Sequence, residues 1–323
     1  MSIFFWTGEE TFLIDEKKQK WIKAFSEKYN GDMNISVLDG QELTAGEITS
    51  DLESMPFLAE KRLIFIKNLP PKVGDKIDDK KSDNILATLE NIDETFVVVF
   101  IEANPDKRTS FYKKFIKHAE IEEFKPLSDY EIKKWIHKNA QEKGGSFLPS
   151  ALEFFVEYVG NNLWQINNEI DKLIAYKGKE KAISENDIEK LIIPDVSFNI
   201  FQLIDAISEK NKKKALKEFN NILKKGESLI QVLFTIIGQI RTLILAKEFP
   251  KVDKNILIKE LKLHPFVASK IFKFVNNFSS EELQKIYKKL LDIDIGIKTG
   301  GIIISNKNEK ALALALETMI LKL

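Results

Sequence analysis

Apolar residues in the first third of the chain alternate between short continuous runs and helix-spaced patterns. Four runs predict strands, at residues 2–6, 34–40, 62–69 and 95–103. The last two are almost wholly apolar, which is typical of parallel strands covered on both faces. Apolar residues three and four apart predict intervening helices at 10–29, 44–55, 84–91 and about 109–119. With a fifth strand expected at EIEEF (120–124), this alternation predicts a doubly wound α/β domain over residues 1–125.

The rest of the chain has the period of helices throughout. Ser128 and Glu131 form a capping box at the start of the first of them, as Thr44 and Glu47 do in the α/β part. Helical patterns up to Pro194 predict a small helical domain over residues 126–194. A larger helical domain is expected over 195–323, where residues 227–249 are apolar on most of the helix circumference, as in the central helix of a bundle. The predicted fold class is therefore α/β plus all-α.

The composition limits the class of protein and the cellular location that we expect. Apolar residues make up 44% and charged residues 30%, as in a folded globular chain. Lys+Arg and Asp+Glu both total 49, so no overall positive field attracts nucleic acid, and contact with DNA is expected only locally or within a larger assembly. The absence of cysteine excludes disulfides and thiolate metal sites. Without a signal-peptide pattern or an apolar run of roughly 20 residues, we expect a cytoplasmic protein without a membrane span.

Nucleotide binding is the first function to consider for an α/β domain that is followed by helices. A phosphate-binding loop has the pattern G-x-x-x-x-G-K-[ST], but here the first strand is followed by WTGEETFLIDEKK, with Gly8 as its only glycine and Lys17 too far along. Glu102 ends the fourth strand where an ATPase would place an acidic residue, and we interpret it as a strand-end carboxylate. The histidines have no ligand spacing: His118, His137 and His264. We expect no catalytic residue, cofactor or metal.

Four consecutive apolar residues stand where the second helix meets the third strand: Met55, Pro56, Phe57 and Leu58. Pro56 lacks an N–H group and favours a turn here. Four neighbours cannot all face one core in either helix or strand geometry. Either Phe57 and Leu58 fasten the helix to the sheet edge, or some of the four project outward and bind another protein.

The domain order, the missing phosphate loop and four short stretches together resemble the delta subunit of bacterial DNA polymerase III, a clamp-loader subunit. The stretches are PFLAEKRLIFIKN (56–68), NEIDKL (168–173), NIFQLIDAI (199–207) and IKTG (297–300). The resemblance covers nearly the whole chain. The resemblance also distinguishes delta from the other loader subunits. The ATP-hydrolysing subunits keep their phosphate loop. The delta-prime subunit keeps a Ser-Arg-Cys motif, which a chain without cysteine lacks.

The resemblance implies an AAA+-like first domain that does not bind ATP, a small helical lid domain and a C-terminal helical collar domain. It implies a non-catalytic part of the polymerase holoenzyme that binds and opens the sliding clamp (beta subunit) for loading at primed DNA. The other loader subunits would meet the collar, where we expect residues 292–300 near a contact, and DNA would be met only in the assembled loader. The alternative is an AAA+-type ATPase or nucleotide-sensing switch with a degenerate phosphate loop, which binding of labelled ATP would reveal.

The resemblance also assigns the four apolar residues. The family's clamp-binding wedge lies at the end of a helix just before a strand, which here corresponds to Met55, Pro56, Phe57 and Leu58. The match is residue by residue at Phe57 and looser at Pro56, where some relatives carry leucine. The second anchor beside Phe57 therefore stays open between Met55 and Leu58.

Overall fold

The computed structural model describes residues 3–29, 31–75, 77–178, 181–194, 196–224, 226, 228–249, 251–304 and 309–322. The first residue of the strand expected at 2–6 and the expected start of the third domain at 195 lie outside this set. The chain forms two compact units, Met1–Pro126 and Leu127–Leu323. A finer division of the second unit near residue 194 stays a proposal.

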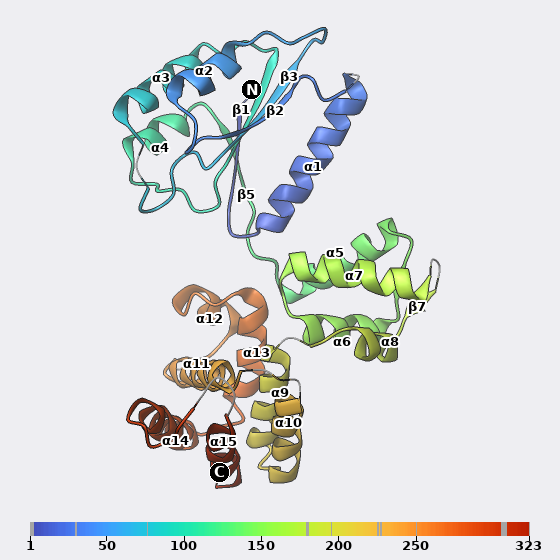
Figure 1. Ribbon diagram of the computed structural model, residues 1–323, viewed down its shortest axis with the longest axis vertical. Coiled ribbons are helices and arrows are strands. Elements are labelled where there is room, and N and C mark those ends of the chain that lie inside the picture. Colours follow the sequence, from blue (N-terminus) through green and yellow to red (C-terminus); the bar gives the residue numbers. More distant parts are fainter. Residues whose placement is uncertain are drawn as a thin grey trace. The chain divides into compact units, whose positions relative to one another are not determined.

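The first unit is a five-stranded parallel sheet with helices on both faces (Figure 1). Its strands, in the order β2-β3-β4-β1-β5 across the sheet, are β1 (Ile3–Thr7), β2 (Ile35–Asp39), β3 (Arg62–Lys67), β4 (Phe96–Ile101) and β5 (Glu120–Glu123). Its helices are α1 (Thr11–Lys28), α2 (Ala45–Glu53), α3 (Asp79–Glu90) and α4 (Ser110–Phe115). The α/β fold predicted from strand–helix alternation is confirmed.

The alternation of side chains along β3 assigns the two faces of the sheet. Leu63 and Phe65 join the cluster beneath α1, whereas Ile64 and Ile66 join the cluster beneath α2, α3 and α4. All four side chains are at most 1% exposed, as expected for a strand covered on both faces. Figure 1 shows α1 alone on one side and the other three helices opposite.

Several boundaries differ from those predicted. The helix expected at about 109–119 ends at Phe115, and the strand expected at 95–103 spans Phe96–Ile101. The helix expected at 84–91 begins at Asp79, because Asp78 accepts a hydrogen bond from the Lys81 N–H and caps it within an otherwise polar stretch. The helix expected at 44–55 ends at Glu53, since Ser54 is already extended, so Met55 is not helical. The strand expected to reach residue 69 ends at Lys67.

The second unit is almost entirely helical. Its helices are α5 (Asp129–Glu142), α6 (Pro149–Val159), α7 (Leu163–Lys177), α8 (Glu185–Leu191), α9 (Val196–Ser208), α10 (Lys212–Lys224), α11 (Leu229–Lys247), α12 (Lys254–Glu260), α13 (Pro265–Val275), α14 (Ser280–Lys298) and α15 (Lys310–Leu321). A parallel pair of two-residue strands, β6 (Ser146–Phe147) and β7 (Ala182–Ile183), corrects the expectation that everything after residue 125 is helical. Two residues are too few to produce a strand pattern in the sequence.

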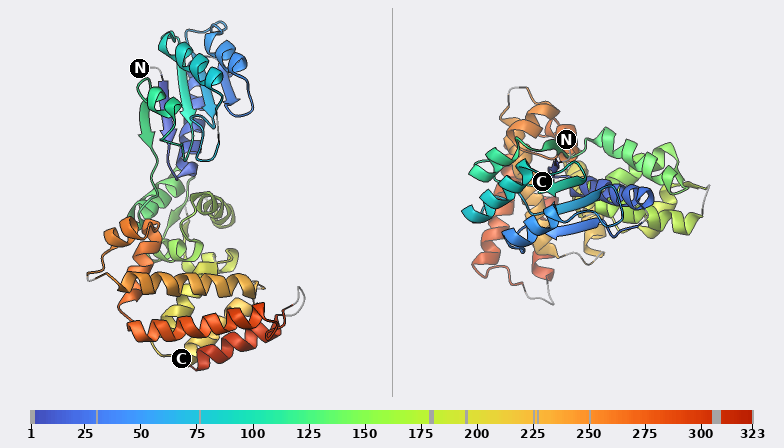
Figure 2. Two further views of the ribbon diagram at one scale, coloured as in Figure 1. Left: turned by 90° about the vertical axis from the view of Figure 1, so that its left-hand side faces the viewer. Right: turned by 90° about the horizontal axis from the view of Figure 1, so that it is seen from above.

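The long helix α11 is the core helix that its apolar circumference predicts. Among the described helices it alone is long and apolar enough to cross a membrane by length and composition. Residues along it, from Leu229 through Ile236 to Ala246, are buried in the cluster that joins α9 to α15. Figure 2 (left) shows α11 and α14 side by side, and the two helices pack against each other.

Candidate protein-binding loop and the carboxyl edge of the sheet

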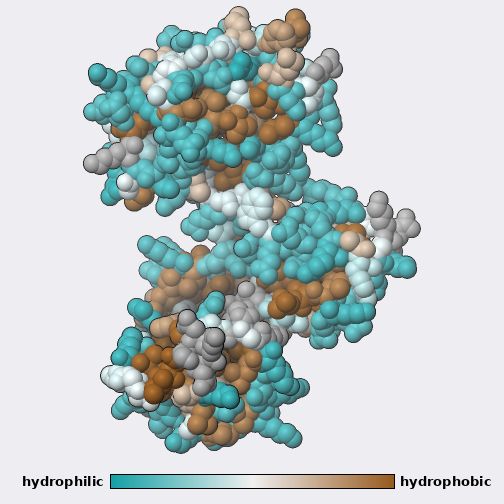
Figure 3. Space-filling view, in the orientation of Figure 1, coloured by the Kyte–Doolittle hydropathy of each residue, from teal (hydrophilic) through white to brown (hydrophobic). Residues whose placement is uncertain are grey.

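Residues 54–61 connect α2 to β3 at the amino edge of the sheet, and we call this connection the apolar loop. Met55, Phe57 and Leu58 are 73%, 56% and 91% exposed, and Pro56 is half-buried. Figure 3 shows hydrophobic residues gathered at this upper end of the sheet domain. The apolar side chains of this loop therefore face solvent instead of fastening α2 to the sheet.

The residue that follows the apolar loop is tied to the helix before the loop and to the sheet. Arg62, the first residue of β3, forms an ion pair with Asp51 in the last turn of α2. Its guanidinium also donates to the Ser36 Oγ on β2 at 3.0 Å. At the other end of α2, Thr44 and Glu47 form the predicted capping box. The ion pair joins the last turn of α2 to the first residue of β3, the two elements that flank the apolar loop.

The middle of the loop is held through its main chain by Asn34. The Phe57 N–H donates to the Asn34 Oδ1 at 2.6 Å, and the Asn34 Nδ2 donates to the Phe57 carbonyl oxygen at 2.8 Å. Asn34 is only 3% exposed, and its own carbonyl oxygen accepts from the Leu63 N–H at 2.9 Å. The main chain of Phe57 is thus fixed to the sheet while its ring stays outside.

Leu58 follows in an unusual backbone conformation. Its φ is 51°, in the left-handed region that a leucine adopts at a cost of about 1–2 kcal/mol. Because the side chain is 91% exposed, burial of that side chain in the fold does not offset this cost. Strained backbone positions cluster at binding and active sites, where the surrounding structure holds them in place.

The opposite, carboxyl edge of the sheet is where parallel α/β folds bind nucleotides. Here the β1–α1 loop, where a phosphate loop would lie, is bonded to neighbouring main chain. In the β1–α1 loop, the Gly8 N–H donates to the Ala103 carbonyl oxygen and the Glu10 N–H to that of Phe124, both at 3.1 Å. A side chain on Gly8 would place its Cβ 2.2 Å from the Phe124 carbonyl oxygen. Glu9 and Glu10 stand where phosphate would need positive charge. Burial raises the pKa of Glu10, and its carboxyl group adds nothing that attracts phosphate.

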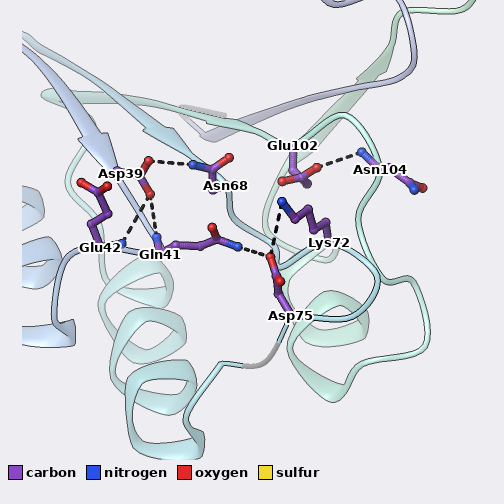
Figure 4. Close-up of polar contacts among 8 residues, drawn as sticks. All are labelled: Asp39, Gln41, Glu42, Asn68, Lys72, Asp75, Glu102 and Asn104. Atoms are coloured by element: carbon purple, nitrogen blue, oxygen red, sulfur yellow. Dashed lines mark hydrogen bonds and ion pairs between the residues drawn. The ribbon is translucent and has the colours of Figure 1, made fainter. Parts of the chain in front are cut away.

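Polar side chains along the rest of this edge bond to one another (Figure 4). Asp39, at the end of β2, accepts from the Asn68 Nδ2 at 2.7 Å and from the Gln41 N–H at 2.9 Å. Glu102 is 7% exposed, and its Oε1 accepts from the Asn104 N–H at 2.9 Å. Its carboxylate caps the turn after β4, as a strand-end carboxylate does.

Metal ligation has no support in the described part of the chain, where no three His, Cys, Asp or Glu residues gather. The three histidines lie on separate elements. His264 caps α13 by accepting from the Phe266 N–H at 3.2 Å, and His118 lies 3.9 Å from a Glu90 carboxylate oxygen.

Comparison with known proteins identifies the family of this chain. A family described as DNA polymerase III, delta subunit, matches residues 4–125, and one described as DNA polymerase III delta subunit, C-terminal domain, matches residues 197–323. The chain belongs to the DNA polymerase III delta-subunit family. The resemblance drawn from four short stretches is thereby confirmed.

Relatives of this delta-family chain match it almost end to end. It is 29% identical over 316 residues to DNA polymerase III subunit delta of Bacillus subtilis, covering 96% of this chain and 89% of that protein. It is 23% identical over 304 residues to the probable subunit delta of Aquifex aeolicus, covering 90% and 85%. The solved structure of the Bacillus subtilis DNA clamp loader delta protein matches with a TM-score of 0.71 at 26% identity, covering 100% of this chain and 95% of that one. The predicted AAA+-like fold is confirmed by this likeness.

The helical unit of this delta-family chain also leaves apolar side chains exposed. Phe234 and Leu245 on α11 are 53% and 43% exposed and lie eleven residues apart, which is about three helical turns and places them on one face. Leu291 and Ile295 on α14 lie four residues apart and are 47% and 48% exposed. Ile295 belongs to the stretch 292–300 that the sequence singled out.

Two residues beside the apolar loop escaped sequence analysis. The sequence pattern places Asn34 only at the start of the second strand, and it gives no role to its neighbour Met33, which is 77% exposed. Met33 directly precedes the residue that bonds Phe57, and it is a further exposed apolar residue in this part of the chain. A methionine in a polar turn, YNGDMN, was the available signal.

Proposed function

We propose that this chain is a clamp-loader subunit that binds the sliding clamp through the apolar loop and helps to open the ring for loading at primed DNA. The observation that carries this proposal is the exposure of Met55, Phe57 and Leu58 on a loop whose main chain is held by the sheet. Large exposed side chains fixed in place are the kind that bind a hydrophobic pocket on a partner.

The remaining partners follow from membership of the delta family. The other loader subunits would meet the second unit as a collar, through the exposed apolar side chains on α11 and α14. DNA would be met in the assembled loader, since the chain has no net charge. As a replication subunit, the protein is expected in the cytoplasm.

The test is a double change, Phe57→Ala with Leu58→Ala. Burying a Phe or Leu side chain on binding is worth roughly 1.5–3 kcal/mol, and about 1.4 kcal/mol is tenfold in Kd. Affinity for the sliding clamp of the same organism, measured by calorimetry, should therefore fall at least about tenfold. Because less than half of the Phe57 side chain and less than a tenth of Leu58 are buried, Tm should fall by no more than about 4 °C.

A matched control is Val73→Ala. Val73 is 55% exposed, but it lies in the connection after β3, at the opposite edge of the sheet. It should leave clamp affinity unchanged. A double variant that melts more than about 10 °C lower and still binds the clamp normally would mean that the apolar loop fastens α2 to the sheet and is not the binding element.

A further inference from the structure

Asn34 bridges two segments that are 23 residues apart in the sequence. It lies just before β2, and its main-chain carbonyl accepts from the first interior residue of β3, Leu63. The Asn34 side chain then reaches the apolar loop and bonds both main-chain groups of Phe57. A buried side chain at the start of β2 therefore bonds the main chain of a loop residue.

The chemistry of this bridge requires a side-chain amide. An amide carries a donor and an acceptor side by side, and of the side chains with both it is the one that can face an N–H and a carbonyl oxygen of the same residue at once. A carboxylate keeps the acceptor, loses the donor and turns an anionic oxygen toward the Phe57 carbonyl oxygen. Both bonds end on main-chain atoms, so they leave the ring of Phe57 free for a partner.

The loop has little else to hold its middle. Its apolar side chains are exposed, and Leu58 is held in a left-handed conformation that a free chain would leave. Without the two bonds from Asn34, the segment between Met55 and Leu58 would sample many conformations. Ordering the segment when a partner binds would then cost conformational entropy, which lowers affinity.

We propose that Asn34 is a positioning residue for clamp binding, which presets the main chain of Phe57 so that the apolar side chains are already in place when the clamp arrives. This inference rests on the proposed clamp-binding role of the apolar loop. Asn34 itself is buried and touches no partner; it acts through Phe57.

The first measurement needs no substitution. Hydrogen exchange of the free, full-length protein should find the Phe57 amide protected, because its proton is bonded to a buried acceptor. Exchange at the rate of an unstructured peptide would overturn the proposal, since the loop would then not be preset.

The second measurement uses Asn34→Asp, which keeps the shape of the side chain. The Phe57 region should exchange faster, and clamp affinity should fall about fivefold to tenfold. Asn34→Ala, which removes both bonds without adding charge, should act in the same direction and serves if the aspartate variant does not fold. The matched control is Asn68→Asp, the same substitution at the carboxyl end of β3, where the Asn68 side chain donates to Asp39. It should lower Tm but leave clamp affinity unchanged.

A double-mutant cycle separates positioning from a general effect on the fold. With Phe57→Ala and Leu58→Ala in place, Asn34→Asp should weaken clamp binding by much less than it does alone, because two of the side chains that it positions are gone. A full additional loss would contradict the proposal. If the double alanine variant itself binds like wild type, the proposed function fails. If that variant binds weakly and Asn34→Asp and Asn34→Ala both bind like wild type, only the role of Asn34 is refuted.

Discussion

Replacing Leu58 by glycine should raise the stability of the protein and lower its affinity for the clamp at the same time. The φ of Leu58 is 51°, and removing its side chain relieves a backbone cost of about 1–2 kcal/mol. With the side chain 91% exposed, the burial lost is only about 0.2 kcal/mol. Glycine also gives the unfolded chain more conformational freedom, which lowers the free energy of unfolding by about 0.5–1 kcal/mol.

The sum of these terms is a gain of about 0.5 kcal/mol, or a rise in Tm of about 1–3 °C. Calorimetric unfolding measures this rise. Binding should move the other way, because an anchoring leucine contributes roughly 1.5–3 kcal/mol when it is buried in a pocket. Titration calorimetry with the clamp should therefore give a Kd at least about tenfold higher.

Met55→Gly is the matched control for the backbone argument. Met55 is 73% exposed and lies in the same loop, but its φ is not in the left-handed region. Its replacement should lower the free energy of unfolding by about 0.5–1 kcal/mol. If Leu58→Gly lowers Tm as Met55→Gly does, the strain assigned to Leu58 is wrong. If Leu58→Gly leaves Kd unchanged and Met55→Gly raises it, the second anchor is Met55.

Two further predictions concern the β1–α1 loop and the proposed collar. Gly8→Ala should destabilise the protein by more than the roughly 1–3 kcal/mol of backbone strain alone, because the new Cβ would meet the Phe124 carbonyl oxygen at 2.2 Å. Gly31 has a similar φ of 123°, but within the described part of the chain a Cβ added there would meet nothing within 4 Å. Gly31→Ala should therefore show only the loss of stability that comes from backbone strain. Equal losses of Tm for Gly8→Ala and Gly31→Ala would contradict the predicted clash. Ile295→Ser should reduce incorporation into the loader, measured by gel filtration of the mixed subunits, whereas Lys285→Ser on the same helix should not; normal assembly of Ile295→Ser would remove this face of α14 from the proposed interface.

Elements with a strong local pattern could be predicted from the sequence. The apolar runs of β3 and β4 correctly predicted that both faces of these strands are covered. The capping boxes at Thr44 and Ser128 are present as predicted. The start of α3 was missed because Asp78 is one of several acidic residues in a polar stretch, any of which could cap a helix. The β6–β7 pair was missed because its partners lie more than thirty residues apart and each has two residues.

The apolar loop was predictable for a geometric reason. Side chains in a helix or strand are divided between two faces, so a run of four apolar residues at a junction cannot be buried entirely in one core. Met55, Phe57 and Leu58 are indeed the ones that face solvent. The left-handed conformation of Leu58 was not predictable, since neither glycine nor asparagine marks it.

Asn34 could not be predicted because its role depends on contacts between segments distant in the sequence. An asparagine before a strand is ordinary turn chemistry, and only the parallel alignment of β2 with β3 brings its amide to Phe57. The side chains proposed to bind a partner and the side chain that holds the loop thus lie in different segments. Because the bridge ends on main-chain atoms, changes in the ring at position 57 should alter how well the clamp is bound, while changes at Asn34 should alter how far the loop is ordered beforehand. Under this proposal, a loop can expose its apolar side chains and still be held in place before a partner binds.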